Sequence, residues 1–363
     1  MLQFKNETFK IMQIADTQEG TKVSPDTLDL INAALDRENP DLVVYSGDQI
    51  WGKTAFKGSR DKVKSVLDIL TKPVRNRKIP FTVCFGNHDR QVGLSNDEQF
   101  EIYKEFDCFV GKSEEGIDGC ANHIIEIKDG DEIKFLLYLI DSHSNLDIGY
   151  DCVHQNQIDW YRKKRDEYEE KCGKLIPSVV IQHIPLCEVF ELLTEVKKNT
   201  KGAVRGFRTH ANRFYILNSE KVNKEGFMKE SPADPQKNSG EFTAFKEKGE
   251  VIGVYFGHDH NNSFNGKVDG IDLGYTQGAG FHVYGPGKDR GVRIIELKKD
   301  GSFSTYDLRF KDIVGNKLKE PFKYAIFQIM PTNMFDALTR AVKFFAALGA
   351  AAVVAILAVL LFG

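Results

Sequence analysis

The sequence has few cysteines and no excess of positive charge, and each shortage argues against a class of function. The six cysteines show no C-x-x-C spacing, which argues against a zinc ribbon or a thioredoxin-like redox centre. An even number permits disulfides outside a reducing compartment, but nothing in the spacing demands them. We interpret Cys84 and Cys187, which have apolar sequence neighbours, as ordinary core thiols. The net charge of −3 gives no bulk attraction for nucleic acid, so no nucleic-acid partner is expected.

Long uncharged apolar runs are also absent, with one exception at the end of the sequence. Residues 344–363 are twenty positions without a charge, mostly Ala, Val, Leu, Ile and Phe. At about 1.5 Å per residue such a helix spans about 30 Å, the thickness of a bilayer's hydrocarbon core. Arg340 and Lys343 precede the run and no cation follows it, which favours a cytoplasmic location for the preceding domain. We expect a single-pass C-terminal anchor in a lipid bilayer, with a buried core helix as the alternative.

The rest of the chain alternates apolar strand-like runs with helix-like segments. The first residues lack a basic region followed by an apolar stretch, so no signal peptide is expected. Helices are expected at 25–37, 60–71, 97–106 and 155–171. Strands alternating with helices predict crossover connections and a largely parallel sheet.

After about residue 250 the pattern changes to short strands separated by glycine. These expected strands are 251–256, 266–273, 291–297 and 302–308. They predict a meander that completes a second sheet, and the polar stretches 199–208 and 223–238 predict surface loops. We expect an α/β fold in which two sheets pack face to face with helices outside. One domain of residues 1–330 is expected to hold it, followed by a membrane-anchoring helix within 331–363.

Five short polar clusters, each directly after an apolar run, are the most informative feature of the chain. The clusters are Asp16–Gln18, Gly47–Asp48, Gly86–Asp89, Gln182–His183 and Gly257–His260. Such apolar runs are typical of buried strands, and ligand sites in α/β sheets lie beyond the carboxyl ends of strands. The candidate metal ligands combine carboxylates, amide oxygens and imidazoles: Asp16, Gln18, Asp48, Asn87, His183, His258 and His260.

This set of side chains indicates an open metal site. It contains no thiolate, which disfavours structural zinc and favours Mn, Fe, Zn or Mg. Seven candidates exceed the need of one ion but suit two divalent ions about 3.5–4 Å apart, which clamp both oxygens of an in-line displacement. Alternation along an extended chain predicts that Asp16 and Gln18 face one side, as do His258 and His260.

The order D-x-[HQ], G-D, G-N-H-[DE], H, G-H-x-H resembles that of the calcineurin-like metallophosphoesterases, on their purple-acid-phosphatase side. The resemblance extends from about residue 10 to 310 and implies a four-layer α/β/β/α sandwich with a dinuclear metal centre. The implied ligands are Asp16, Gln18 and His260 for one ion, Asn87, His183 and His258 for the other, and Asp48 as the bridge. His88 matches the family histidine that contacts substrate and protonates the leaving group while a metal-bound hydroxide attacks phosphorus.

Two positions depart from the family pattern. Gln18 replaces the usual histidine with a neutral amide, which should weaken the binding of softer metals. Trp51 stands where purple enzymes carry the tyrosine that binds ferric iron, and an indole cannot donate a phenolate. We therefore predict a colourless enzyme with divalent metals.

The resemblance predicts hydrolysis of phosphomonoesters, with phosphodiesters as the second substrate class and a catalytically weak, membrane-tethered scaffold as the non-enzymatic alternative. Residues 47–54 also fit the P-loop pattern literally, but the Asp48 carboxylate would repel phosphate there, so we interpret the match as chance. The histidines without a motif are His123, His143, His154, His210 and His282. His143 follows a strand-like run and is the strongest candidate for an exception.

Overall fold

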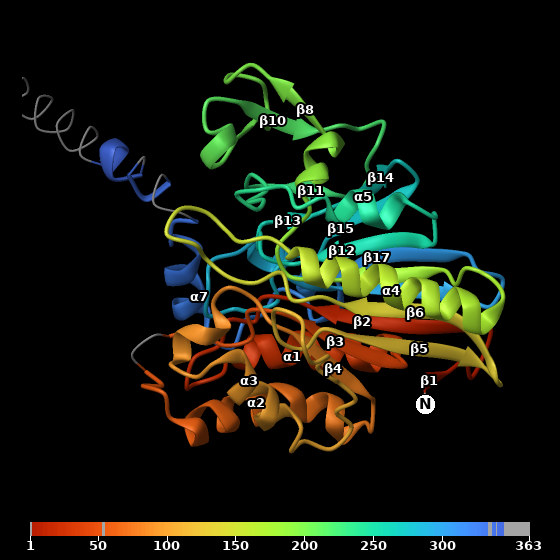
Figure 1. Ribbon diagram of the computed structural model, residues 1–363. Helices are drawn as coiled ribbons and strands as arrows, with labels where there is room; N and C mark the ends of the chain where they lie inside the picture. Colours follow the sequence, from red (N-terminus) through yellow and green to blue (C-terminus); the bar gives the residue numbers. More distant parts are fainter. Residues whose placement is uncertain (1, 53–54, 333–335, 339, 345–363) are drawn as a thin grey trace, which may run out of the picture.

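The computed structural model describes residues 2–52, 55–332, 336–338 and 340–344, in which two large β-sheets pack face to face with helices outside (Figure 1). The five-stranded sheet runs β17 (Phe303–Arg309), β16 (Gly291–Lys298), β2 (Thr8–Ile14), β3 (Leu42–Ser46), β4 (Phe81–Cys84). The seven-stranded sheet runs β1 (Leu2–Gln3), β5 (His123–Asp129), β6 (Glu132–Leu139), β7 (Ser178–Ile181), β12 (Val251–Phe256), β15 (Ile271–Tyr275), β14 (Asn265–Val268). The mixed α/β class is confirmed.

The strands that lead to the polar clusters are parallel within each sheet. In one sheet β2, β3 and β4 are parallel neighbours, and in the other β6, β7, β12 and β15 are. Ile11, Val44, Leu137 and Val179 belong to a fully buried apolar layer between the two sheets. Because both faces of these strands are covered, their sequences are continuous apolar runs and do not alternate between apolar and polar residues.

Helices cover the outer faces of both sheets. They are α1 (Pro25–Glu38), α2 (Arg60–Asn76), α3 (Asn96–Tyr103), α4 (Gln155–Cys172), α5 (Glu241–Lys246), α6 (Phe310–Ile313) and α7 (Pro321–Gln328). The apolar faces of α1 and α2 pack on β2 and β3, and those of α4 and α5 pack on β6, β7 and β12. Local sequence sets the ends of α1, because Ser24 caps its N-terminus before Pro25 and Asn39 ends it in a left-handed conformation.

The expected meander after residue 250 is wrong. Residues 266–273 are part of a hairpin, β14 and β15, that turns at Asp269–Gly270 and extends the seven-stranded sheet. The following hairpin, β16 and β17, instead joins the other sheet, with β16 antiparallel to β2. Glycine-separated strands predict hairpins, but the pattern carries no information on which sheet each hairpin joins.

Two expected loops contain short strands. A small three-stranded sheet forms from β8 (Leu193–Val196), β10 (Phe214–Leu217) and β9 (Val204–Arg205), and it projects from the two main sheets at the top of Figure 1. The pair β11 (Phe227–Met228) and β13 (Asn262–Ser263) lies beneath it.

The predicted membrane span, 344–363, lies outside the described residues except for Phe344. In the part of the chain that the structure describes, no helix combines the length and the apolar character that crossing a bilayer requires.

Candidate metal centre

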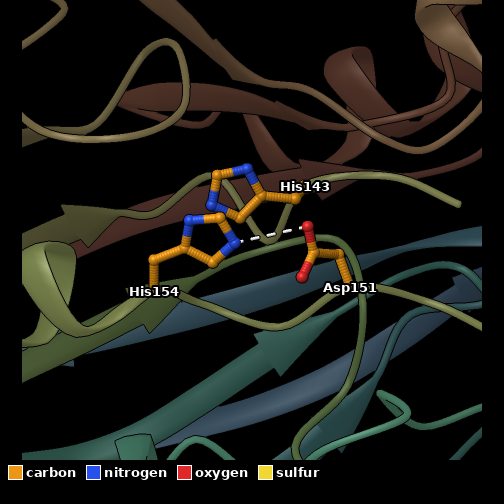
Figure 2. Close-up of side chains that lie close together, drawn as sticks. All are labelled: His143, Asp151 and His154. Carbon is orange, nitrogen blue, oxygen red and sulfur yellow. Dashed lines mark hydrogen bonds and ion pairs between the residues drawn. The ribbon is translucent and has the colours of Figure 1, made fainter. Parts of the chain in front are cut away.

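Among the described residues, two groups of side chains have metal-ligating chemistry, and one of them lies in the loop before α4. His143, Asp151 and His154 come together there (Figure 2), with His154 Nε2 at 3.3 Å from Asp151 Oδ2. The two imidazoles stack at 4.0 Å with an interplanar angle of 22°. Imidazole lone pairs lie in the ring plane, so stacked rings do not converge on one ion, and His143 Nε2 already pairs with Gln157 Oε1 at 2.7 Å. We interpret this group as a structural stack that closes the loop.

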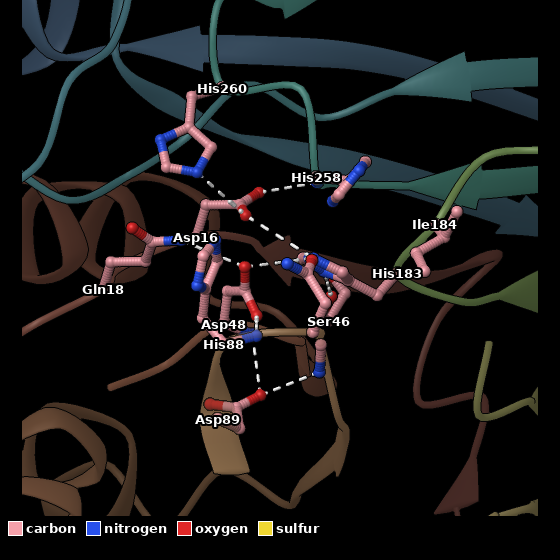
Figure 3. A network of polar contacts seen from close by, with 12 residues as sticks. Asp16, Gln18, Ser46, Asp48, His88, Asp89, His183, Ile184, His258 and His260 are labelled. Carbon is pink, nitrogen blue, oxygen red and sulfur yellow. Dashed lines mark hydrogen bonds and ion pairs between the residues drawn. The ribbon is translucent and has the colours of Figure 1, made fainter. Parts of the chain in front are cut away.

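The larger group lies where strands of both sheets end, and it contains the predicted ligands (Figure 3). Asp16, Asp48 and Asn87 follow strands of the five-stranded sheet, whereas His183 and His258 follow strands of the seven-stranded sheet. All seven predicted ligands are buried: Asp16, Gln18, Asp48, Asn87, His183, His258 and His260. The two sheets therefore each contribute part of one polar centre.

Two carboxylates occupy the middle of this centre. Asp16 Oδ1 lies 3.3 Å from His260 Nε2 and 3.9 Å from His183 Nε2. Asp48 Oδ2 lies 3.3 Å from His183 Nε2. Ligand atoms of Asp16, Asp48 and His260 all lie within 4.8 Å of one another, a spacing that suits a shared cation.

The backbone at these positions is turned rather than extended. Asp16, Gln18, Asp48 and His258 have φ angles of 53°, 38°, 55° and 72°, in the left-handed region. The expected alternation along an extended chain is therefore not what aims these side chains; sharp turns past the strand ends do. Left-handed non-glycine residues carry strain and cluster at functional sites.

Buried ligand atoms that make no hydrogen bond indicate whether a cation fits this centre. Asp16 Oδ1, Asn87 Oδ1, His183 Nε2 and His258 Nε2 are buried and make no hydrogen bond; the contacts of Asp16 with His260 and of His183 with Asp48 are ion pairs at 3.3 Å. Each is an atom type that binds Mn, Fe, Zn or Mg, and leaving such atoms unpaired in the interior is costly. The residues present therefore fit a metal centre.

Backbone carbonyls orient two of the imidazoles. His183 Nδ1 lies 2.9 Å from the Ser46 carbonyl oxygen, and His260 Nδ1 lies 3.0 Å from that of Tyr284. Donation from Nδ1–H fixes the tautomer and leaves each Nε2 lone pair aimed at the carboxylates. This arrangement is typical of histidines that bind metals.

The protonation states also suit a cation. Burial alone would raise the pKa of Asp48, but the charges of His183 and His88 lower it below its ordinary value. Burial opposes the charge of His183, whereas Asp48 and Asp16 raise its pKa to about 10. Burial, followed by the charge of His183, lowers the pKa of His258. A proton on His183 Nε2 balances the carboxylates, and a bound cation would take its place.

Gln18 lies in the centre but presents its amide nitrogen. Its Nε2 donates a hydrogen bond to Asp48 Oδ2 at 3.0 Å. Coordination through the amide oxygen, as the sequence predicts, requires the amide group to rotate. The ligand role of Gln18 therefore stays a prediction.

The Gly86–Asp89 motif holds both the predicted acid and an anchor for it. His88 donates its backbone N–H to Asp48 Oδ1 at 2.7 Å, and its Nδ1 is buried without a partner. Asp89 accepts hydrogen bonds at 2.8 Å from the backbone N–H groups of Asp48, Gln49 and Gly86. Asp89 thus ties the turns after β3 and β4 together, a role that sequence reasoning missed.

Two tyrosines that sequence reasoning also missed pack on the metal-type histidines. The Tyr284 ring stacks on His260 at 4.2 Å with an interplanar angle of 1°. The Tyr150 ring meets the His258 ring edge to face at 4.4 Å. Tyr284 belongs to a glycine-rich stretch, 278–285, which was a weak signal of pocket-lining residues. Tyr150 gave no signal, because it lies in a loop far from any motif.

The P-loop match gains no support from the fold. Lys53 and Thr54 lie outside the described residues, and the next helix, α2, begins only at Arg60. The turn after β3 instead directs Asp48 into the polar centre.

The comparisons with known proteins agree with this geometry. The family profile of Calcineurin-like phosphoesterase matches residues 9–262. The chain is 30% identical over 331 residues to "Probable inactive purple acid phosphatase 14" of Arabidopsis thaliana, covering 80% of this chain and 75% of the relative. It is 29% identical over 324 residues to "Phosphatase DCR2" of Saccharomyces cerevisiae, covering 80% of this chain and 51% of that protein.

A solved structure gives the same fold. The crystal structure of a dimetal phosphatase from Danio rerio superimposes with a TM-score of 0.50 at 11% identity, covering 82% of this chain and 98% of that chain. Two metal ions are typical of this fold, and the candidate ligands for them are present here. The chain belongs to the calcineurin-like phosphoesterase family, on its purple-acid-phosphatase-like side.

Proposed function

We propose that the protein is a phosphoesterase that binds two divalent ions, among Mn, Fe, Zn and Mg, and hydrolyses phosphomonoesters. The observation that carries this proposal is a buried group of carboxylate, amide and imidazole ligand atoms, four of which make no hydrogen bond. A purely structural polar cluster would satisfy these atoms with hydrogen bonds. Phosphodiesters are the second substrate class that the same centre suits.

When bound, two divalent ions supply an activated water and stabilise charge on the phosphoryl oxygens. The chain itself orients the imidazoles through the Ser46 and Tyr284 carbonyls and fixes the Asp48 turn through Asp89. His88 is the proposed general acid, and its buried, unpartnered Nδ1 leaves one ring nitrogen free of protein hydrogen bonds. Proton transfer from such a positioned imidazole to the leaving oxygen accelerates hydrolysis by about 10²–10⁴-fold.

Release of phenol from phenyl phosphate by the full chain with added Mn²⁺ tests this function. We expect turnover that EDTA abolishes, and a decrease of about 10²-fold or more in kcat for His88→Asn. Parallel reactions with a diaryl phosphate separate monoesterase from diesterase activity. No turnover with any of the four ions, together with unchanged metal binding by His88→Asn, would support the scaffold alternative. The word "inactive" in the names of three relatives favours that alternative.

Iron loading tests the predicted absence of a tyrosinate ligand. Trp51 is half-buried, and its backbone N–H donates to the Glu19 carbonyl oxygen at 3.0 Å. We expect iron-loaded protein to stay colourless in the visible range, because an indole gives no phenolate-to-iron band. A purple band would overturn the divalent-metal proposal.

We further propose that residues 344–363 anchor the protein in a lipid bilayer with the catalytic domain on the cytoplasmic side. Apolar side chains are already exposed before this run, with Phe322 at 78% and Ile329 at 72% exposure. Flotation with phosphatidylcholine vesicles tests the anchor, and we expect the full chain to float and a chain ending at 332 to stay behind. Equal behaviour of the two would contradict it.

A further inference from the structure

The segment that contains the small sheet of β8, β10 and β9 is strongly basic, mostly in the turns that connect its strands. We call residues 193–217, which contain it, the basic insert. It holds six basic residues and one acidic residue, whereas the whole chain has a net charge of −3. The basic residues are Lys197, Lys198, Lys201, Arg205, Arg208 and Arg213. Such a local concentration of positive charge attracts anions toward the surface that carries it.

One cation of the basic insert is held on aromatic rings. The Arg208 guanidinium lies 5.6 Å from the centre of the Tyr150 ring and 5.1 Å from that of Phe207. Within the described part of the chain, Arg208 forms no ion pair with a carboxylate, whereas Arg213 pairs with Glu195 at 3.9 Å. Stacking on rings holds a guanidinium in place and leaves its N–H donors available to an anion.

The backbone at Arg208 is also unusual. Its φ angle is 45°, in the left-handed region, at the start of the single turn Arg208–His210. A non-glycine residue in this region carries strain, which surrounding contacts must offset. The contacts include the stacking on Tyr150 and Phe207 and a hydrogen bond at 3.0 Å from the Ala211 N–H to the Arg208 carbonyl oxygen, so the fold holds Arg208 in a defined position despite its exposure.

Tyr150 connects Arg208 to the metal centre. The same ring that lies under the guanidinium contacts His258 at 4.4 Å. The distances of 5.6 Å and 4.4 Å together place the guanidinium within 10.0 Å of the His258 ring centre. Because the guanidinium stacks on the ring that packs against His258, Arg208 lies beside the metal centre, where it reaches a group next to the scissile phosphate rather than the ions themselves.

We propose that Arg208 binds a second anionic group, a phosphate or carboxylate, on the leaving part of the substrate. The planar guanidinium matches either group with two parallel hydrogen bonds. The lysines of the basic insert raise the local concentration of such substrates. This inference rests on the proposed function and names its substrate class: phosphomonoesters that carry a further anion beyond the scissile group.

Two matched substrates test the inference on the full chain loaded with Mn²⁺: phenyl phosphate and 4-(phosphonomethyl)phenyl phosphate. The phosphonate adds an anion that cannot be hydrolysed, so release of inorganic phosphate reports one reaction in both. We expect kcat/KM to be about tenfold higher for the phosphonate substrate, because a charge-assisted bidentate contact forms only there. Arg208→Gln should remove most of this preference through KM, and Arg208→Lys should retain part of it as a point charge.

Arg213→Gln is the matched control, because it removes an exposed arginine of the basic insert that already has a partner. It should keep the preference within about twofold, since surface ion pairs contribute little. Equal kcat/KM of the wild type for the two substrates would overturn the inference. So would an equal loss on both substrates in Arg208→Gln, which would mean that Arg208 contacts the scissile phosphate or only supports Tyr150.

Binding measured by calorimetry separates this inference from the proposed function. In a His88→Asn background, the phosphonate compound should bind about tenfold more tightly than phenyl phosphate, and Arg208→Gln should abolish the difference. If neither the wild type nor any variant hydrolyses either compound, the proposed phosphatase function is rejected. The difference in Kd still tests the role of Arg208 in that case. Equal Kd values in the Arg208-containing protein would reject it.

Discussion

At the scale of single residues, the candidate metal centre depends on glycines whose backbone lies so close to the carboxylates that a Cβ atom would not fit. A Cβ added at Gly257 would lie 2.6 Å from Asp16 Oδ2. One added at Gly86 would overlap the Asp48 carboxylate and lie 2.6 Å from the Asp48 backbone nitrogen. These glycines are therefore required by close packing around the candidate ligands.

Replacing Gly86 with alanine tests this packing. We expect Gly86→Ala to weaken Mn²⁺ binding at least about tenfold and to lower the free energy of unfolding by about 1–3 kcal/mol, because Asp48 must move. Calorimetric Mn²⁺ titration and urea unfolding measure the two effects. Gly20→Ala is the control, since its Cβ meets nothing within 4 Å. Wild-type affinity in Gly86→Ala would contradict the argument.

His123 predicts a pH dependence of stability that is independent of the metal centre. It is buried in β5, with Nδ1 at 2.7 Å from the Ala121 carbonyl oxygen and Nε2 at 2.9 Å from Thr82 Oγ1. Burial lowers its pKa to about 4. Below about pH 6.5 the unfolded chain therefore binds a proton that the folded chain does not, and stability falls until about pH 4.

The expected size follows from the gap between the two pKa values. Between pH 7 and pH 5, His123 should cost about 2 kcal/mol of the unfolding free energy. From pH 7 to pH 5 the unfolding free energy of His123→Asn, measured by urea unfolding, should therefore fall by about 2 kcal/mol less than that of the wild type. Identical losses in the two proteins would mean that the folded state protonates His123 as readily as the unfolded chain does.

At the scale of elements, polar contacts set how the two sheets face each other beside the metal centre. Thr276, just after β15, donates from Oγ1 to Gln13 Oε1 on β2 at 2.8 Å, and both residues are fully buried. The Gln13 amide nitrogen then donates to Ser46 Oγ at the end of β3, at 2.9 Å. The hydrogen bonds link strands of both sheets near the turns that carry Asp16 and Asp48.

Thr276→Val tests this link between the sheets. The substitution keeps the shape but leaves Gln13 Oε1 buried without its donor, which should lower the unfolding free energy by about 1–3 kcal/mol. Urea unfolding measures it, and Thr194→Val on the exposed edge of β8 serves as the control. A change as small as in the control would show that the contact does not hold the sheets together.

At the scale of the whole molecule, the candidate ligands join the two halves of the sandwich. Asp16 and Asp48 come from one sheet, whereas His183 and His258 come from the other. An ion bound among them connects both sheets, and the unfolded chain has no such arrangement. Metal binding should therefore stabilise the folded state as a whole.

Calorimetric melting with Mn²⁺ and with EDTA measures this effect. At a concentration about 100 times its Kd, the ion should add about 2.7 kcal/mol to the unfolding free energy and raise Tm. Asp48→Asn should lose most of the rise, and the exposed Asp61→Asn should keep it. Equal Tm values for the wild type with and without metal would argue against a built cation site.

The strands that lead to the polar clusters and the starts of α1 to α4 are predictable from the sequence, because they depend on local signals, whereas β5, β9 and β11 were not predicted. The helix predicted at 25–37 is observed at Pro25–Glu38, where Ser24 and Asn39 mark its ends. The strand ends that carry the polar clusters are equally readable, since each is an apolar run followed by Gly or Asp. The sheet that each of the later hairpins joins was not readable, because both sheets offer similar apolar edges.

The sequence by itself determined which chemical groups are present and in which order they follow the strands, because residue type and spacing are properties of the sequence alone. Only the tertiary structure decided which groups meet: Asp48 with His183, the Gln18 amide nitrogen with Asp48, and Tyr150 with both His258 and Arg208. The physical reason is that turns with left-handed backbone and loops distant in sequence aim these side chains, and no local periodicity encodes either.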